Sequence, residues 1–268
     1  MTSTTLKRAA DGRGVEAAGR AGLLAKGAIY AIVGGLAIQI PLGLGGRAAD
    51  RQGALRSLAG EPLGGAMLVA LGLGFAGYAL WRLAQAALDR DREGKDAKGV
   101  VKRLGHLGKG LLYAGSAFVT FGIVLGARGG GSDERQETAQ VLGLPFGRWL
   151  VAAAGAAFVA AGLFNAFRAV TTRFRKHLRE HELNRKVRPW AIAVGVAGHA
   201  ARGVVFALIG VFLLRAALQY DPNEAVGLDG ALLKLAQQPY GPWLLGAVAA
   251  GLLAYAAYCV VQARYRDV

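Results

Sequence analysis

Five long uncharged stretches dominate the sequence, and each contains at least 18 residues. An α-helix needs about 20 apolar residues to cross a hydrocarbon core of roughly 30 Å. Lipid cannot satisfy free backbone groups, and these stretches lack the alternation of barrel strands, so membrane-spanning helices are predicted. The predicted spans are 27–46, 62–81, 110–127, 149–167 and 235–263.

A sixth span is predicted around 203–214, where only 12 residues separate Arg202 from Arg215. It reaches membrane length only if it begins near Ala191 and includes His199 and Arg202. The predicted fold class is all-α, a polytopic membrane protein with six transmembrane helices.

Lys and Arg are distributed unevenly over the predicted loops. The chain has 32 of them against 17 Asp and Glu, a net charge of +15. Nineteen lie in the N-terminal tail, 89–104, 171–190 and the C-terminus, whereas six lie in the other three loops. The positive-inside rule therefore predicts that the first set and both termini face the cytoplasm. Since the charges alternate with apolar spans, a bilayer explains them better than nucleic acid, which is not an expected partner.

Aromatic and small residues support this interpretation. All four tryptophans lie at predicted span ends, as expected of an interfacial belt; they are Trp81, Trp149, Trp190 and Trp243. Small residues four positions apart predict close helix packing; the pairs are Ala31 with Gly35, Gly72 with Ala76, and Ala247 with Gly251.

An internal repeat organises the chain. Three segments share a glycine, three residues, a basic residue, a glycine, two residues, an aromatic residue and alanine. Each aromatic is followed 32 or 33 residues later by Pro-x-Gly, which is predicted to open the next span. The motif residues are Gly22, Lys26, Gly27 and Tyr30 with Pro62 and Gly64; Gly105, Lys109, Gly110 and Tyr113 with Pro145 and Gly147; and Gly198, Arg202, Gly203 and Phe206 with Pro239 and Gly241.

Each repeat therefore contains two helices joined by an outer connection, and the three repeats run parallel. A pseudo-threefold axis along the membrane normal is the predicted symmetry, unlike the inverted repeats of many transporters. The predicted parts are a flexible tail (1–18), repeat 1 (19–88), a basic linker (89–101), repeat 2 (102–170), a second basic linker (171–190) and repeat 3 (191–268).

Short apolar patterns precede each proline and predict an amphipathic turn or two at the outer interface. Their apolar residues are Ala54, Leu55 and Leu58; Ala139 and Leu142; and Leu232, Leu233 and Leu235.

The repeated motif and its Pro-x-Gly partner resemble a bacterial family of uncharacterised six-helix inner-membrane proteins, built from three copies of a two-helix domain of unknown function. The resemblance covers nearly the whole chain. It implies a bacterial inner-membrane location and carries no activity, substrate or catalytic residue.

The motif cations Lys26, Lys109 and Arg202 are the main candidate site residues, with the aromatics Tyr30, Tyr113 and Phe206 one helical turn further on. Snorkelling to lipid headgroups or phosphate anchoring is the preferred interpretation. A ring of three cations that attracts a small anion is the alternative.

Other polar residues invite weaker hypotheses. His106 and His199 follow the first motif glycine, where Leu23 stands in repeat 1, and packing is favoured over proton coupling. Gln85, Arg168 and Gln262 recur 23 residues after each proline; with Arg82 and Asn165 they are predicted to bond between helices. His177, Glu180 and His181 match a zinc-peptidase pattern in letters, but a solvated helix extending from the fourth span is the preferred interpretation.

These observations favour a non-enzymatic protein of the inner (cytoplasmic) membrane whose basic cytoplasmic face binds anionic lipid or organises a membrane-protein partner. A channel or transporter for a small anion is the alternative. No catalytic residue, cofactor or metal is expected.

Overall fold

A computed structural model describes residues 13–44, 48–49, 51–88, 97–126, 134–177 and 187–265, and in these residues the regular structure is entirely helical. The helices are α2 (Arg13–Ile38), α3 (Arg51–Ala59), α4 (Gly64–Leu88), α5 (Ala97–Val124), α6 (Glu134–Leu142), α7 (Gly147–Thr171), η1 (Arg173–His177), α8 (Val187–Gln219), η3 (Pro222–Glu224), α9 (Leu228–Ala236) and α10 (Gly241–Tyr265). They belong to two compact units: residues 1–28, 55–129 and 259–268 form unit 1, and residues 29–54 and 130–258 form unit 2.

Six of the described helices are long and apolar enough to cross a membrane. This confirms the predicted number, including the sixth span, since α8 continues through His199 and Arg202 for 33 residues. The first predicted span is displaced, because the membrane-length part of α2 runs over Gly19–Ile38. Charged residues near a helix end do not stop a helix, whereas Pro41 disfavours its continuation.

Short helices α3, α6 and α9 precede the three proline turns, which confirms the predicted amphipathic segments. Ala54, Leu55, Leu142 and Leu232 are buried, as their spacing predicts. Ala139 is exposed beside the buried Thr138, and Leu233 is 45% exposed, so these two apolar side chains lie outside the buried stripe. The buried stripe follows the 3.6-residue period, from which Ala139 of α6 and Leu233 of α9 depart.

The residue between proline and glycine is left-handed in all three repeats. Leu63, Phe146 and Tyr240 have φ values of 65°, 63° and 61°, and each is at least 80% exposed. The glycine that follows lies against the preceding short helix: a Cβ on Gly147 would collide with the backbone of Val141. Each repeat therefore has a tight backbone turn at Pro-x-Gly that requires the glycine of this motif.

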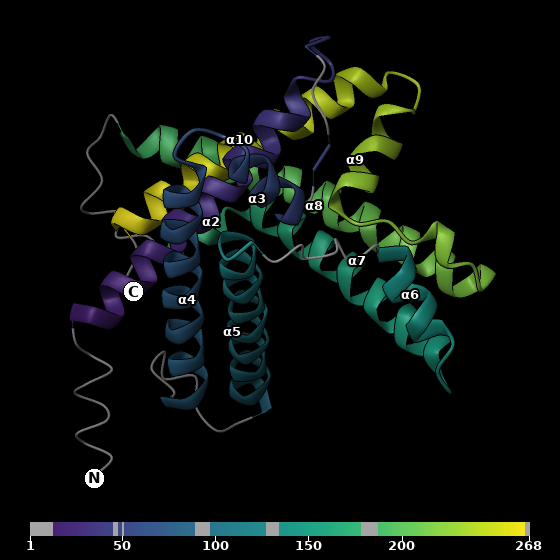
Figure 1. The fold of residues 1–268 in the computed structure, drawn as a ribbon, viewed down its shortest axis with the longest axis horizontal. Helices are drawn as coiled ribbons and strands as arrows, with labels where there is room; N and C mark the ends of the chain where they lie inside the picture. Colours follow the sequence, from purple (N-terminus) through teal and green to yellow (C-terminus); the bar gives the residue numbers. More distant parts are fainter. Residues whose placement is uncertain are drawn as a thin grey trace. The chain divides into compact units, whose positions relative to one another are not determined.

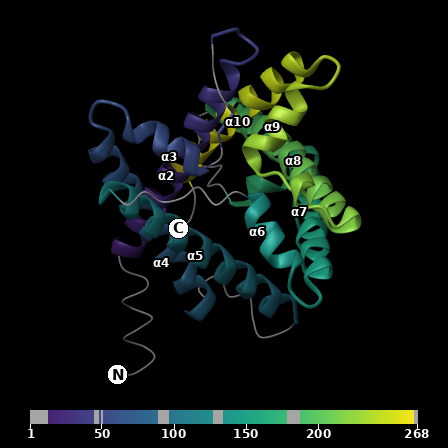
Figure 2. The ribbon, with the colours of Figure 1, turned by 45° about the vertical axis from the view of Figure 1, so that its right-hand side comes forward.

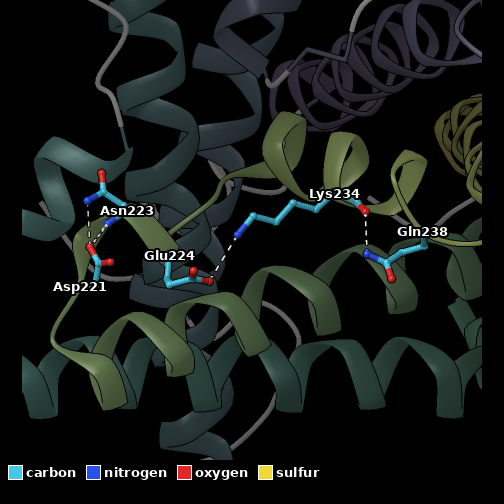
Figure 3. Close-up of polar contacts among 5 residues, drawn as sticks. All are labelled: Asp221, Asn223, Glu224, Lys234 and Gln238. Carbon is cyan, nitrogen blue, oxygen red and sulfur yellow. Dashed lines mark hydrogen bonds and ion pairs between the residues drawn. The ribbon is translucent and has the colours of Figure 1, made fainter.

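The third outer connection carries a local polar network (Figure 3). The Asp221 carboxylate accepts hydrogen bonds from the backbone N–H and the side-chain amide of Asn223, both at 2.9 Å. Lys234 of α9 donates to Glu224 of η3 at 3.4 Å, and its Nζ lies 4.1 Å from the centroid of the Phe212 ring. These contacts hold η3, α9 and α8 together.

In unit 1, α4 lies beside α5 (Figure 1). A Cβ on Gly72 would lie 2.9 Å from Phe121, and one on Gly110 would lie 2.7 Å from Leu83. The same helix α4 meets α2 where Gly74 faces Ala25. Because glycine has no side chain, the helices of this unit approach each other closely at these three positions.

In unit 2, α7 lies beside α8 in both ribbon views (Figures 1 and 2). Gly155 and Gly162 of α7 face Gly210 and Gly203 of α8, with carbonyl oxygens about 3 Å from the built Cβ positions. Backbone therefore packs directly on backbone along this pair. These two contacts lie seven residues apart along each helix. Of the glycines predicted to pack in four-residue pairs, Gly72 and Gly251 meet a neighbouring helix, whereas Gly35 has nothing within 4 Å of its Cβ position.

The same kinds of contact recur in unit 2 for α10. Gly251 faces Ala201 of α8, as Gly74 faces Ala25 in unit 1, and Gly34 of α2 faces the Ala249 carbonyl of α10. By their positions after the motif glycine and the proline, Gly34 and Ala249 correspond to Gly210 and Gly155. The repeats therefore share their helix contacts as well as their sequence motif.

Candidate functional site

A polar bond joins α4 to α5 inside unit 1. Nη1 of Arg82 donates to Nδ1 of His106 over 3.0 Å. Arg82 is only 5% exposed. A guanidinium stays charged at any physiological pH, so unit 1 buries a positive charge next to a histidine. The accepting Nδ1 must carry a lone pair, which places the ring proton on Nε2.

Further groups hold Arg82 in place. Nη1 also donates to Gln85 Oε1 at 2.8 Å, and Nη2 donates to the Tyr78 hydroxyl at 2.7 Å. The guanidinium carbon lies 4.3 Å from the centroid of the Trp81 ring and 5.0 Å from that of the Tyr78 ring. Trp81 is 1% exposed, and its ring covers the buried cation in a cation–π contact; its predicted place in an interfacial belt stays a prediction. The other three tryptophans are exposed.

A second polar bond joins α7 to α8 in unit 2. Nδ1 of His199 lies 3.1 Å from Oδ1 of Asn165, and Nδ2 of Asn165 donates to the Ala161 carbonyl at 2.8 Å. Because the amide nitrogen is used there, Oδ1 is the acceptor and His199 donates from Nδ1. His199 is 1% exposed, and the rings of Phe174, Tyr255 and Tyr258 surround it at centroid distances of 5.2–5.6 Å.

These two bonds occupy equivalent positions of the repeat. Arg82 and Asn165 are each the twentieth residue after the proline, and His106 and His199 each follow the first motif glycine. In the remaining copies of these two positions, Cys259 is the twentieth residue after its proline and Leu23 follows the first motif glycine. The interhelical bonding predicted for Arg82 and Asn165 is confirmed; Gln85 accepts from Arg82 of its own helix, and the bonding between helices predicted for Gln85, Arg168 and Gln262 stays a prediction. The histidines use opposite roles: His106 accepts at Nδ1, and His199 donates.

The three motif cations have different surroundings. Lys109 is exposed, whereas Lys26 and Arg202 are partly buried. Arg202 donates from Nη1 to the Tyr255 hydroxyl at 2.6 Å. Its guanidinium carbon also lies 4.5, 4.9 and 5.5 Å from three aromatic ring centroids, which belong to Tyr255, Phe206 and Tyr30 respectively.

The motif aromatics pack with other rings. Tyr30 lies 4.8 Å from the Tyr255 ring, and Phe206 lies 5.8 Å from the Phe158 ring. Tyr113 is buried and meets Tyr78 at 4.5 Å. The aromatic position of the motif therefore builds packing between helices, and its predicted role in binding an anion or a lipid headgroup stays a prediction.

The segment after α7 departs from its prediction. A solvated helix extending from the fourth span is wrong, because α7 ends at Thr171, Thr172 is left-handed with φ 49°, and η1 follows. Phe174 of η1 is fully buried against His199 and Tyr258, and this apolar anchor redirects the chain. His177 ends η1, while Glu180 and His181 lie outside the described residues.

The sequence interpretation did not identify the tyrosines of these clusters. Tyr78 and Tyr255 each stand sixteen residues after their proline, and both hydroxyls accept from an arginine. That shared position was the available signal. Among the described residues there is no group of three or more His, Cys, Asp or Glu able to hold a metal ion. The clusters instead present arginine, tyrosine, histidine and amide groups, which suit hydrogen bonding to an anion.

Comparison with known proteins agrees with the repeat. Residues 21–89, 104–172 and 197–266 each match the family described as Domain of Unknown Function (DUF1206). The chain is similar to a Bacillus subtilis (strain 168) protein described as "Uncharacterized protein YxxB", with 34% identity over 248 residues, 92% of this chain and 90% of that protein. No solved structure matches.

Proposed function

The chain belongs to the DUF1206 family, as its threefold motif predicts, and on this premise we propose that it is a non-enzymatic protein of the bacterial inner (cytoplasmic) membrane whose basic cytoplasmic face binds anionic lipid. Its multi-pass character follows from the six membrane-length helices. The lipid role and the orientation are our proposal, and a membrane-protein partner held through the same face is its extension.

The distribution of charge carries this proposal. Nineteen Lys and Arg flank one set of helix ends, and six flank the other set. Each basic residue near an anionic leaflet contributes about 1 kcal/mol of attraction. The six membrane-length segments contain no Asp or Glu, so they offer no pair of carboxylates for general acid–base catalysis.

Side chains at the basic helix ends support the same proposal. Arg103 of α5 donates from Nε to the Ala86 carbonyl at 2.8 Å and from Nη2 to the Ala87 carbonyl at 3.3 Å. A cation at the carboxyl end of α4 satisfies orphan carbonyls and complements the helix dipole. On α5 the exposed Lys102 and Lys109 extend this positive surface.

Lipid analysis of the purified protein tests the proposal. We expect phosphatidylglycerol and cardiolipin to be enriched over their share of the host membrane, and the triple variant Lys26→Ala/Lys109→Ala/Arg202→Ala to retain less of both. Gln39→Ala, which removes a polar side chain just beyond the end of α2 without changing charge, is the control. Equal lipid retention by the wild type and the triple variant, with no enrichment, would contradict the proposal.

The alternative is a channel or transporter for a small anion. Liposomes loaded with a chloride-sensitive dye distinguish it from lipid binding. The lipid proposal predicts chloride entry equal to that of empty liposomes, and a protein-dependent flux abolished by the triple variant would favour the alternative.

A further inference from the structure

The buried guanidinium of Arg82 has an Nε–H that meets no acceptor among the described residues. Arginine carries five N–H donors; both on Nη1 are directed to Gln85 and His106, and one on Nη2 is given to Tyr78. Nε is buried and has no acceptor among the residues that the structure describes. The Nε–H and Nη2–H edge is the fork that binds two oxygens of a carboxylate or phosphate side by side.

The charge of this cluster is also uncompensated by the two helices that build it. Its partners Tyr78, Gln85 and His106 are neutral acceptors, and neither α4 nor α5 contains Asp or Glu. A buried cation costs several kcal/mol unless an opposite charge accompanies it. Arg103 and Lys109 lie one helical turn from His106 on either side and add positive charge.

The position of Arg82 in α4 puts it close to one edge of a hydrocarbon core if the helix crosses from its first residue. Arg82 lies eighteen residues after the start of α4 and six before its end, which at 1.5 Å per residue is roughly 27 Å and 9 Å along the axis. The hydrocarbon core is about 30 Å thick. The guanidinium is therefore within reach of the headgroups at the basic end of the helix.

We propose that the Arg82 and His106 cluster is a binding site for the phosphate of an anionic phospholipid, held by the Nε and Nη2 fork of Arg82 between α4 and α5. The inference rests on the proposed function and gives it a location. The corresponding cluster of unit 2 provides an internal contrast, because Asn165 replaces the arginine there and its bond to His199 is neutral.

That contrast supplies the variants. Arg82→Asn gives repeat 1 the residue that repeat 2 already carries beside its histidine, so the interhelical bond is retained while the fork is lost. Arg82→Lys keeps the charge and removes the fork. Asn165→Ala, the matched control, breaks the neutral bond of unit 2 without changing charge.

The experiment is native mass spectrometry of the full-length protein from phosphatidylcholine nanodiscs that contain increasing phosphatidylglycerol. Charged hydrogen bonds contribute about 1.5–3 kcal/mol, so we expect the tightest phosphatidylglycerol to bind at least about tenfold more weakly to Arg82→Asn. Arg82→Lys should also bind more weakly, and Asn165→Ala should bind as the wild type does.

The outcomes separate this inference from the proposed function. Unchanged phosphatidylglycerol binding by Arg82→Asn and Arg82→Lys, in a protein that still prefers this lipid over phosphatidylcholine, overturns the site alone. A wild type without that preference overturns both. Inorganic phosphate is then added to the wild type in pure phosphatidylcholine. If it raises the unfolding temperature as much as phosphatidylglycerol does, the site binds a free anion in place of a lipid, and the inference is overturned.

An internal carboxylate is the remaining competitor for the fork. Asp89 and Asp91 follow α4 in the sequence. We expect Asp89→Asn/Asp91→Asn to leave the unfolding temperature in phosphatidylcholine unchanged. A decrease in that temperature, absent when the same two substitutions are made in Arg82→Asn, would show that the chain supplies its own counter-ion, which contradicts the inference.

Discussion

His199 donates from Nδ1 to Oδ1 of Asn165 over 3.1 Å, and this bond joins α8 to α7 inside unit 2. Both side chains are more than nine-tenths buried. One repeat earlier the corresponding histidine accepts from an arginine instead. Equivalent positions of the repeat thus hold a pair with a cation in unit 1 and a neutral pair in unit 2. Substitutions in the two units can therefore distinguish the effect of the charge from the effect of the interhelical bond.

Removal of the Asn165 acceptor should destabilise unit 2. Asn165→Leu leaves the buried Nδ1–H of His199 without its partner, at a cost of about 1–2 kcal/mol in the free energy of unfolding. The double variant Asn165→Cys/His199→Leu takes the residues found at the equivalent positions Cys259 and Leu23, and we expect it to be more stable than Asn165→Leu. Thermal unfolding in nanodiscs measures both, and an equal loss in the two variants would contradict a specific bond.

The glycine contacts of α7 and α8 predict a strong response to one methyl group. A Cβ on Gly162 would lie 2.7 Å from the backbone nitrogen of Ala207, so Gly162→Ala should lower the free energy of unfolding by about 1–3 kcal/mol. Gly35→Ala in α2 is the control, since nothing lies within 4 Å of its Cβ position. It should be neutral or stabilising, because alanine favours a helix over glycine. Equal effects at the two positions would refute backbone contact.

The left-handed turn at Phe146 predicts an order of stabilities. Its φ is 63°, and this conformation costs a side chain of L chirality about 1–2 kcal/mol that glycine does not incur. Phe146→Gly should be at least as stable as the wild type, whereas Phe146→Val should be less stable, because branching at Cβ aggravates the clash. Chemical unfolding in detergent gives the order, and a valine variant as stable as the wild type would count against the turn.

The hydroxyl of Tyr255 should matter through Arg202. Tyr255→Phe removes the acceptor at 2.6 Å and keeps the ring whose centroid lies 4.5 Å from the guanidinium. Because Arg202 is partly exposed, we expect a loss of about 1 kcal/mol. Tyr255→Leu also removes the cation–π contact and should cost more. The unfolding temperatures of the two variants separate the contribution of the hydroxyl from that of the ring. Equal values would show that the ring of Tyr255 does not stabilise the protein through Arg202.

The sequence predicts the spans, the repeat and the short outer helices, because hydrophobic length and period are local properties. It places the first span too far along the chain, since Arg20 and Lys26 lie inside α2. It also gives no sign that Trp81 is buried against Arg82. Whether a ring near a helix end faces lipid or a neighbouring helix depends on the helix rotation, which no local pattern sets.

The candidate site was predicted only in fragments. His106 and Arg82 were both singled out, but their bond depends on how α4 and α5 pack, through contacts such as those of Gly72 with Phe121 and of Gly110 with Leu83, which no local pattern reveals. Phe174, one aromatic in a basic segment, gave no signal of its burial. The predicted pseudo-threefold axis and the limits of the tail and linkers stay predictions.

The cytoplasmic position of the basic loops is the central claim, and cysteine labelling tests it most directly. In a Cys259→Ala background, Gly94→Cys reports on the loop between α4 and α5, and Ser132→Cys reports on the loop between α5 and α6. A membrane-impermeant maleimide added to spheroplasts should label position 132 at once and position 94 only after permeabilisation. Labelling of position 94 in sealed spheroplasts, with protection of position 132, would contradict the account.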